Sequence, residues 1–155
     1  MSTLTDVEWD LEYRPRRLRR LAVIAAVVVL AIHITFGALL TISDTGPQNI
    51  GLGDQFAIIL IGIVEAAAIL LFTRPRLRVG ASGVSVRNLV SERLFGWDGV
   101  EGLTYPDKGW SAWLLLPADE HVPVLAVQAW DADRAVTAMN DFRELEERYG
   151  SGGSA

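Results

Sequence analysis

Residues 21–42 read LAVIAAVVVLAIHITFGALLTI, an apolar run of 22 residues that carries no formal charge. A helix of that length is roughly 33 Å long at about 1.5 Å per residue, enough to cross a hydrocarbon core of about 30 Å. A second run, residues 56–72, reads FAIILIGIVEAAAILLF, and its helix can extend back to about residue 52. It contains Glu65, whose cost at mid-bilayer is about 2.5–3.5 kcal/mol and can be offset by a neighbouring span. The two runs therefore predict a transmembrane hairpin with helices at 21–42 and about 52–72.

Arginines flank this pair of runs on both outer sides, whereas the connecting stretch 43–55 contains two Asp and no Lys or Arg. By the positive-inside rule, the arginine-rich sides are cytoplasmic and the loop 43–51 lies outside. The sequence thus predicts a multi-pass protein of the plasma membrane with both termini in the cytoplasm. Cations beside a membrane gain about 1 kcal/mol each from anionic lipids, so we expect the flanking arginines to contact the inner leaflet. They are Arg14, Arg16, Arg17, Arg19, Arg20, Arg74, Arg76 and Arg78.

Two other interpretations of the apolar runs compete with membrane spans. An arginine-rich flank and an apolar run also begin a cleaved signal peptide, but the first run exceeds the usual apolar length of about 7–15 residues. The alternative is that both runs are core helices of a soluble protein, which normally keep a polar stripe that these runs lack. We therefore prefer the transmembrane hairpin.

The two ends of the chain are predicted as tails. Residues 1–20 change from acidic to basic, and we expect a cytoplasmic tail in which Trp9 and Tyr13 are candidate anchors at the membrane interface. Residues 150–155 are rich in Gly and Ser, which is typical of a flexible tail. The chain also contains no Cys, which excludes disulfides, thiolate catalysis and Cys-ligated metals.

Residues 73–149 have the pattern of a small globular domain. Apolar and polar residues alternate on both sides of residues 80–83, which predicts a β-hairpin with strands at 77–79 and 84–89. Further strands are predicted at 91–97, 100–105, 111–116 and 122–128.

A final helix is predicted from an N-cap at Asp131 to a stop at Gly150. The side chains expected to form its core face are Ala135, Val136, Met139, Phe142, Leu145 and Tyr149. Six or seven short strands followed by one amphipathic helix predict a small bent sheet or partial barrel that the C-terminal α-helix caps.

Two stretches of this domain carry a resemblance to a known family. Residues 83–88, GVSVRN, and residues 97–103, WDGVEGL, resemble the pattern of bacterial pleckstrin-homology (PH) domains. They are similar to the actinobacterial branch that includes the low-molecular-weight protein antigen 6 group, and the resemblance covers about residues 74–149. It implies a PH-like domain at 73–149 that serves as a non-enzymatic interaction module on the cytoplasmic membrane face. The motif residues are Gly83, Val84, Val86, Trp97 and Val100.

The resemblance does not carry over a ligand site. Phosphoinositide-binding PH domains hold phosphates with Lys and Arg in a basic first hairpin loop. The loop 80–83, which we take as the counterpart, has no cation. The segment 73–155 contains nine Lys or Arg against twelve Asp or Glu, and a domain of net negative charge binds anionic headgroups and nucleic acids poorly. We therefore expect neither ligand.

Three tryptophans have two interpretations each. Trp97 enters a strand, where an indole usually packs in the core with its N–H bonded to a carbonyl, the alternative being a ligand-contacting surface. Trp110 lies beside a turn and Trp130 just before the last helix. Each of these two either completes the rim of the core or contacts the membrane or a partner.

The apolar runs contain two polar residues that are candidates for function. Measured along the helices from the flanking arginines, Glu65 lies about 13 Å and His33 about 20 Å into the bilayer. In an antiparallel hairpin they are offset by roughly 6 Å, which helix tilt and long side chains can bridge. Three interpretations stay open: a polar contact that holds the hairpin together, a contact with a partner subunit, or an ion or proton relay.

No arrangement of residues in the sequence indicates catalysis. Of the two histidines, His33 lies in an apolar run and His121 in a polar loop, and no serine has a G-x-S-x-G context. We therefore predict a non-enzymatic protein without a cofactor or a bound metal. Its expected role is to present the PH-like domain to a protein partner, whose identity the sequence does not reveal, as a scaffold or assembly factor. The alternatives are an accessory subunit that docks through the hairpin and a lipid sensor that uses the arginines.

Overall fold

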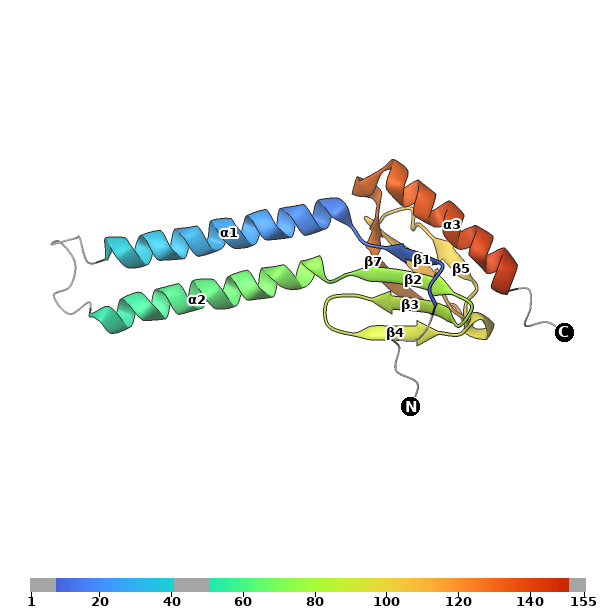
Figure 1. The fold of residues 1–155 in the computed structure, drawn as a ribbon, viewed down its shortest axis with the longest axis horizontal. Coiled ribbons are helices and arrows are strands. Elements are labelled where there is room, and N and C mark those ends of the chain that lie inside the picture. Colours follow the sequence, from blue (N-terminus) through green and yellow to red (C-terminus); the bar gives the residue numbers. More distant parts are fainter. Residues whose placement is uncertain (1–7, 41–50, 151–155) are drawn as a thin grey trace. The chain divides into compact units, whose positions relative to one another are not determined.

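The computed structural model describes residues 8–40 and 51–150 and is shown in Figure 1. Within these ranges the chain forms two units, a helical hairpin at residues 18–73 and a domain that combines residues 8–17 with residues 74–150. Most of the predicted outer loop, 43–51, and of the predicted tail, 150–155, lies outside the described residues. The domain is thus assembled from two segments that the hairpin separates in the sequence.

The hairpin consists of α1 (Arg16–Leu39) and α2 (Leu52–Leu70), followed by a short 3-10 turn, η1 (Leu71–Thr73). Both helices are long and apolar enough, by length and composition, to cross a membrane. The first helix begins five residues before the predicted span, since arginine is a good helix former and continues the helix beyond the apolar run. Hydropathy therefore located the apolar part of this helix but not its beginning.

Small residues line the contact between the two helices. A Cβ added to Gly37 would lie 3.2 Å from Ile59 Cγ1, and one added to Gly62 would lie 2.5 Å from His33 Cβ. The buried residues of the hairpin are Ala22, Ala26, Gly37, Gly62 and Ala66. Their spacing of mostly four residues places them on one face of each helix, and such small residues let two helices pack closely in lipid.

A four-stranded antiparallel sheet begins with a strand that precedes the hairpin in sequence. This strand pairs with the first strand after the hairpin, with Leu11 opposite Val79 and Tyr13 opposite Leu77. The described part of the predicted N-terminal tail is therefore part of the domain, because its apolar Leu11 and Tyr13 complete the sheet and the core. The strand order is β1 (Leu11–Tyr13), β2 (Arg76–Gly80), β3 (Gly83–Arg87) and β4 (Glu92–Phe95).

A second, three-stranded sheet and a C-terminal helix complete the domain (Figure 1). The sheet has the order β5 (Gly102–Thr104), β6 (Ser111–Leu115) and β7 (His121–Gln128), and the helix is α3 (Asp133–Tyr149). Short 3-10 turns precede β5 and α3: η2 (Trp97–Gly99) and η3 (Ala129–Asp131). The predicted strands and helix all occur within a few residues of their expected bounds, and the layout is the PH-like one that the resemblance implied.

The core of the domain lies between the two sheets and α3. Leu77, Val79 and Val84 come from the first sheet, and Leu114 and Val124 come from the second; all five are fully buried. Burial of each such side chain contributes about 1.5–3 kcal/mol. The helix adds four buried residues, which are Ala135, Ala138, Phe142 and Leu145.

Val136 does not belong to the core face of α3, contrary to the prediction. Its side chain is 60% exposed, whereas Ala138 is buried. The four buried positions of α3 follow at three- and four-residue spacing, which turns the side chain at position 136 away from the sheets. The apolar character of Val136 was therefore not sufficient to predict that its side chain faces the core.

Candidate functional site

Residues of the PH-like motif have structural roles in the domain. Gly83 adopts a positive φ of 124°, and a Cβ at this position would collide with the Phe95 carbonyl oxygen. The Trp97 indole nitrogen donates a hydrogen bond to the Gly80 carbonyl oxygen at 2.9 Å, as predicted for a core anchor. Its ring lies 6.1 Å from that of Phe142, between centroids. The other motif residues, Val84, Val86 and Val100, lie in the core or pack against it.

The amide of Asn88 links the two sheets. Its nitrogen donates to the Pro123 carbonyl oxygen at 2.8 Å, and its oxygen accepts from the Leu125 amide at 3.2 Å. The side chain therefore replaces a neighbouring strand at the edge of β7, where backbone groups would otherwise lack partners. This contact accounts for the last residue of the GVSVRN stretch, which the sequence alone left unexplained.

Three of the eight flanking arginines form ion pairs on the domain. Arg14 and Arg78 both contact the Glu12 carboxylate, at 2.7 and 2.9 Å. Arg76 contacts Glu92 at 3.0 Å. The guanidinium groups of Arg14, Arg76 and Arg78 thus neutralise carboxylates of the first sheet. Contact of these three arginines with the inner leaflet stays a prediction.

Both carboxylates respond to these contacts. Partial burial alone would raise the pKa of Glu12, but hydrogen bonds and charge from Arg14 and Arg78 outweigh it and lower the pKa below its usual value. Burial likewise acts to raise the pKa of Glu92, and the Ser85 hydroxyl together with Arg76 reverses this effect and lowers it. The first sheet thus carries an ionised network across its strands.

The other five flanking arginines are exposed and have no ion pair among the residues that the structure describes. They are Arg16, Arg17, Arg19, Arg20 and Arg74. Four of them lie in the first turns of α1, and Arg74 directly follows η1. Five arginines without an ion pair in the described residues therefore lie at the two points where the chain passes between the domain and the hairpin, which we call the crossings.

The carboxylate of Asp131 binds the beginning of α1. It accepts hydrogen bonds from the Arg16 amide at 3.3 Å, the Arg17 amide at 3.2 Å and the Tyr13 hydroxyl at 3.3 Å. These amides have no partner within their own helix, and a negative charge is favourable at a helix N-terminus. Asp131 therefore caps α1. The prediction that it is the N-cap of α3 is wrong, because the residue before α3 is Ala132.

Aromatic and cationic side chains surround this buried carboxylate. Tyr13 is buried, and the Arg134 guanidinium lies 5.3 Å from the centre of its ring. Burial and the charge of Asp131 raise the pKa of Tyr13 to about 12, and the same two causes raise the pKa of Tyr105. Tyr13 is therefore a core residue and not the interfacial anchor that we predicted.

Trp9, the other predicted anchor, lies at the opposite end of the β1–β2 pair. A Cβ added to Gly80, the last residue of β2, would lie 3.3 Å from Trp9 Cα. The Arg78 guanidinium lies 5.9 Å from the centre of the indole. Trp9 thus packs on the strands near Gly80, at the end of β2, and not near Arg76, at its beginning.

The structure changes which loop is the first hairpin connection of the domain. Since β1 pairs directly with β2, that connection is residues 14–75, which include both long helices. The cation-free loop 80–83 joins β2 to β3. Our assumption that it is the counterpart of the first hairpin loop of PH domains is therefore wrong. The tripeptide Arg-Pro-Arg occurs at both ends of the true connection, at 14–16 and at 74–76, and Arg76 is already the first residue of β2. Both prolines are fully buried, and their missing N–H groups end the strand ladder at the two crossings.

Within the hairpin, the structure brings together the two polar residues singled out in the sequence. His33 Nε2 lies 3.7 Å from Glu65 Oε2, and His33 Nδ1 lies 2.9 Å from the Val29 carbonyl oxygen. The His33 ring packs on Gly62, and its side chain is mostly covered, whereas the Glu65 side chain is 52% exposed. The contact thus holds the histidine inside the hairpin but leaves half of the carboxylate at the outer surface.

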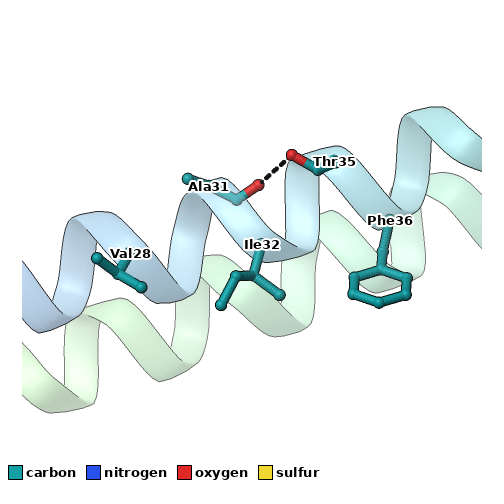
Figure 2. A pocket seen from close by; sticks show the side chains of 5 residues that line it. All are labelled: Val28, Ala31, Ile32, Thr35 and Phe36. Atoms are coloured by element: carbon teal, nitrogen blue, oxygen red, sulfur yellow. Dashed lines mark hydrogen bonds between the residues drawn. The ribbon is translucent and has the colours of Figure 1, made fainter.

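A shallow hollow of about 300 Å³ lies on α1. Figure 2 shows the five side chains that line it, all from this helix: Val28, Ala31, Ile32, Thr35 and Phe36. The Thr35 hydroxyl donates to the Ala31 carbonyl oxygen at 2.8 Å, so the hollow presents no free polar group. Such a surface suits hydrocarbon and offers no chemistry for catalysis.

Metal-ligating side chains are not gathered in the part of the chain that the structure describes. No group of three or more His, Asp or Glu side chains in residues 8–40 and 51–150 is placed to hold a metal ion. Of the two histidines, His33 contacts Glu65, and His121 stacks on Trp113 with ring centroids 4.2 Å apart. The features of the described domain that bear on function are therefore the two crossings and the exposed surface.

The fold and these features define a PH-like domain that carries, between its first two strands, a hairpin of two helices long and apolar enough to span a membrane. Comparison with known proteins agrees with this class. The family model described as Bacterial PH domain matches residues 74–145, and the chain belongs to this family. The match begins after the hairpin, so it does not include β1.

Related proteins occur in mycobacteria. The chain is 44% identical over 144 residues to Uncharacterized protein Rv1417 of Mycobacterium tuberculosis and to Uncharacterized protein Mb1452 of Mycobacterium bovis. In both cases the alignment covers 92% of this chain and 92% of the relative. No solved structure matches the chain. The relatedness therefore extends over the hairpin as well as the domain.

Proposed function

We propose that this protein is a non-enzymatic integral membrane protein that holds its PH-like domain against the cytoplasmic face of the plasma membrane for binding to a protein partner. The observation that carries the proposal is the insertion of the hairpin between the paired strands β1 and β2. Both crossings are direct, because Arg17 and Arg74 are the last domain residues on either side of residues 18–73. A domain attached twice without a linker has little freedom to leave the membrane, which suits a scaffold or an assembly factor.

Charge supports the orientation and indicates the surface that meets the partner. The five free arginines gather at the crossings, as the positive-inside rule requires of a cytoplasmic side. The turns that follow β2, β4 and β6 lie at the other end of the strands. Their charged residues are all acidic: Asp98, Glu101, Asp119 and Glu120. We infer that the partner presents a basic surface to this end of the domain.

Affinity purification of the full chain from native membranes in mild detergent tests this function. We expect a stoichiometric partner whose recovery falls severalfold in a variant that carries Asp98→Asn, Glu101→Gln, Asp119→Asn and Glu120→Gln. The matched control removes two exposed carboxylates from the other end of the domain, Asp107→Asn and Asp133→Asn, and should leave recovery unchanged. Equal recovery of the partner with the quadruple variant and with the wild type would contradict binding at the acidic end.

A second candidate function, an accessory subunit of a larger membrane complex, is favoured by one observation. The Glu65 side chain is half exposed in the otherwise apolar run 56–72, although His33 lies nearby. An exposed carboxyl group in hydrocarbon is costly unless another polar group covers it. In this alternative, a polar side chain of a neighbouring span contacts Glu65.

The two candidates respond to different substitutions. If the hairpin is the docking element, Glu65→Leu should abolish recovery of a membrane-embedded partner. The quadruple variant that lacks the four carboxylates should then have no effect on recovery. The opposite pattern supports binding by the domain. A reporter fused after Ala155 that is active outside the cell would contradict the topology on which both candidates depend.

A further inference from the structure

Large apolar side chains are exposed at one end of the domain. Four of them lie in loops, in η3 or in the first turn of α3 and are 76%, 47%, 53% and 60% exposed: Val90, Trp110, Trp130 and Val136. Among the described residues of the domain, the remaining large apolar side chain with comparable exposure is Leu94, on β4. The positions of the four follow from the strand register and from hydrogen bonds within the domain.

The register of the first sheet places Val90 beside the second crossing. Arg87, the last residue of β3, pairs with Arg76, the first residue of β2. The turn that contains Val90 therefore lies at the end of the sheet where the chain arrives from η1 through Arg74 (Figure 1). This turn is closed by a hydrogen bond from the Asn88 amide to the Ser91 carbonyl oxygen at 3.1 Å.

Hydrogen bonds place the two tryptophans beside the first crossing. The Ala129 amide donates to the Trp110 carbonyl oxygen at 3.0 Å, which joins the segments that carry Trp110 and Trp130. Trp130 directly precedes Asp131, whose carboxylate holds the first two amides of α1. Val136 follows within one helical turn of the start of α3.

The short sequence separation limits how far this end of the domain can lie from the apolar part of α1. Arg17 is four residues before Leu21, which corresponds to about 6 Å along a helix. The polar interface on each side of a hydrocarbon core is roughly 5–7 Å thick. If α1 crosses the membrane, the segment that binds Arg17 is therefore at the depth of the lipid headgroups. Tryptophan is enriched at this depth because its ring is amphipathic.

We propose that Val90, Trp110, Trp130 and Val136 form a rim that inserts into the cytoplasmic interface of the bilayer and fixes the domain on the membrane. The inference rests on the proposed membrane anchoring. The occupant is lipid, because the rim lies at the end of the domain where the chain enters and leaves the hairpin, and the exposed cations Arg16, Arg17 and Arg74 belong to the same end. Anionic headgroups complement these cations, whereas the turns at the opposite end of the domain are acidic.

Quenching of tryptophan fluorescence by brominated lipid tests the rim. The full chain is reconstituted in nanodiscs of phosphatidylcholine and phosphatidylglycerol, with bromine on acyl carbons near the headgroup. We expect strong quenching in the wild type that falls by more than half in the double variant Trp110→Phe and Trp130→Phe. The matched control, Trp9→Phe and Trp113→Phe, removes two tryptophans outside the rim and should not lower the quenched fraction.

A gain of signal provides the second measurement. Val90→Trp adds a tryptophan at the rim and should raise the quenched fraction, whereas Ser82→Trp adds an exposed one in the turn between β2 and β3 and should not. Equal quenching of the Val90→Trp and Ser82→Trp variants, or no loss with the Trp110 and Trp130 substitutions, would overturn the rim. Resistance of the wild type to alkaline extraction from membranes is measured in parallel, because its failure would refute the anchoring itself rather than the rim.

Discussion

At the residue scale, Asp131 is the side chain on which the joint between the domain and α1 depends. It is buried and accepts three hydrogen bonds, two of them from amides that α1 cannot satisfy itself. Asp131→Ala should lower the free energy of unfolding of the domain by about 1–3 kcal/mol, and Asp131→Asn by less because one acceptor oxygen stays. Guanidinium unfolding in detergent micelles, followed by tryptophan emission, measures the change.

The control for this prediction is a neighbouring carboxylate. Asp133 lies in the first turn of α3 and is exposed, so Asp133→Ala should cost much less. Equal costs for the Asp131 and Asp133 substitutions would show that the bonds to α1 contribute nothing to stability.

Glu92 should make the stability of the domain depend on pH. Its pKa is lowered in the folded state from the ordinary value of 4.5, mainly by Ser85 and Arg76 acting against burial. A lowered pKa means that the folded state binds this proton less readily than the unfolded state. The stabilisation is therefore complete above about pH 4.5 and is lost as the pH falls through the lowered pKa. Glu92→Gln should flatten this acid loss, as measured by unfolding at a series of pH values; an unchanged pH profile would contradict the network.

At the scale of the elements, the hairpin depends on close approach at Gly62. A Cβ there would lie 2.5 Å from His33 Cβ, so the helices must separate or the histidine must move. Gly62→Ala should therefore lower the thermal midpoint of the hairpin in detergent, measured by circular dichroism, since overpacking a close contact costs about 1–3 kcal/mol. Gly53→Ala is the matched control in the same helix, because nothing lies within 4 Å of a Cβ at that position. A loss with Gly53→Ala as large as with Gly62→Ala would exclude the contact as the cause.

For the whole molecule, prediction from sequence succeeded where the pattern is local. Apolar length identified the two long helices, and alternation around residues 80–83 identified β2 and β3. The indole of Trp97 was expected to bond to a carbonyl group, and it does so at Gly80. These features depend on residues that are near one another in the chain or on the composition of a single segment.

Prediction failed where a partner is distant in sequence. β1 is only three residues long, and its partner β2 begins after the 62 residues of the connection 14–75, so no local pattern indicates the pair. Asp131 has the sequence of an N-cap for the helix that follows it, yet its carboxylate binds amides at Arg16 and Arg17. The ion pairs of Arg76 and Arg78 were missed for the same reason, because Glu92 and Glu12 become their neighbours only in the folded sheet.

The central claim is that the segment before the hairpin is a strand of the domain, so that both helices are inserted between β1 and β2. Because the chain has no native Cys, a disulfide between two introduced cysteines tests this pairing directly. Glu12 lies opposite Arg78, whereas Ser85 is one strand further away, about 5 Å more. In the full chain in nanodiscs, Glu12→Cys with Arg78→Cys should oxidise rapidly and nearly completely, and Glu12→Cys with Ser85→Cys should not. Equal and slow oxidation of the two pairs would contradict the inserted hairpin.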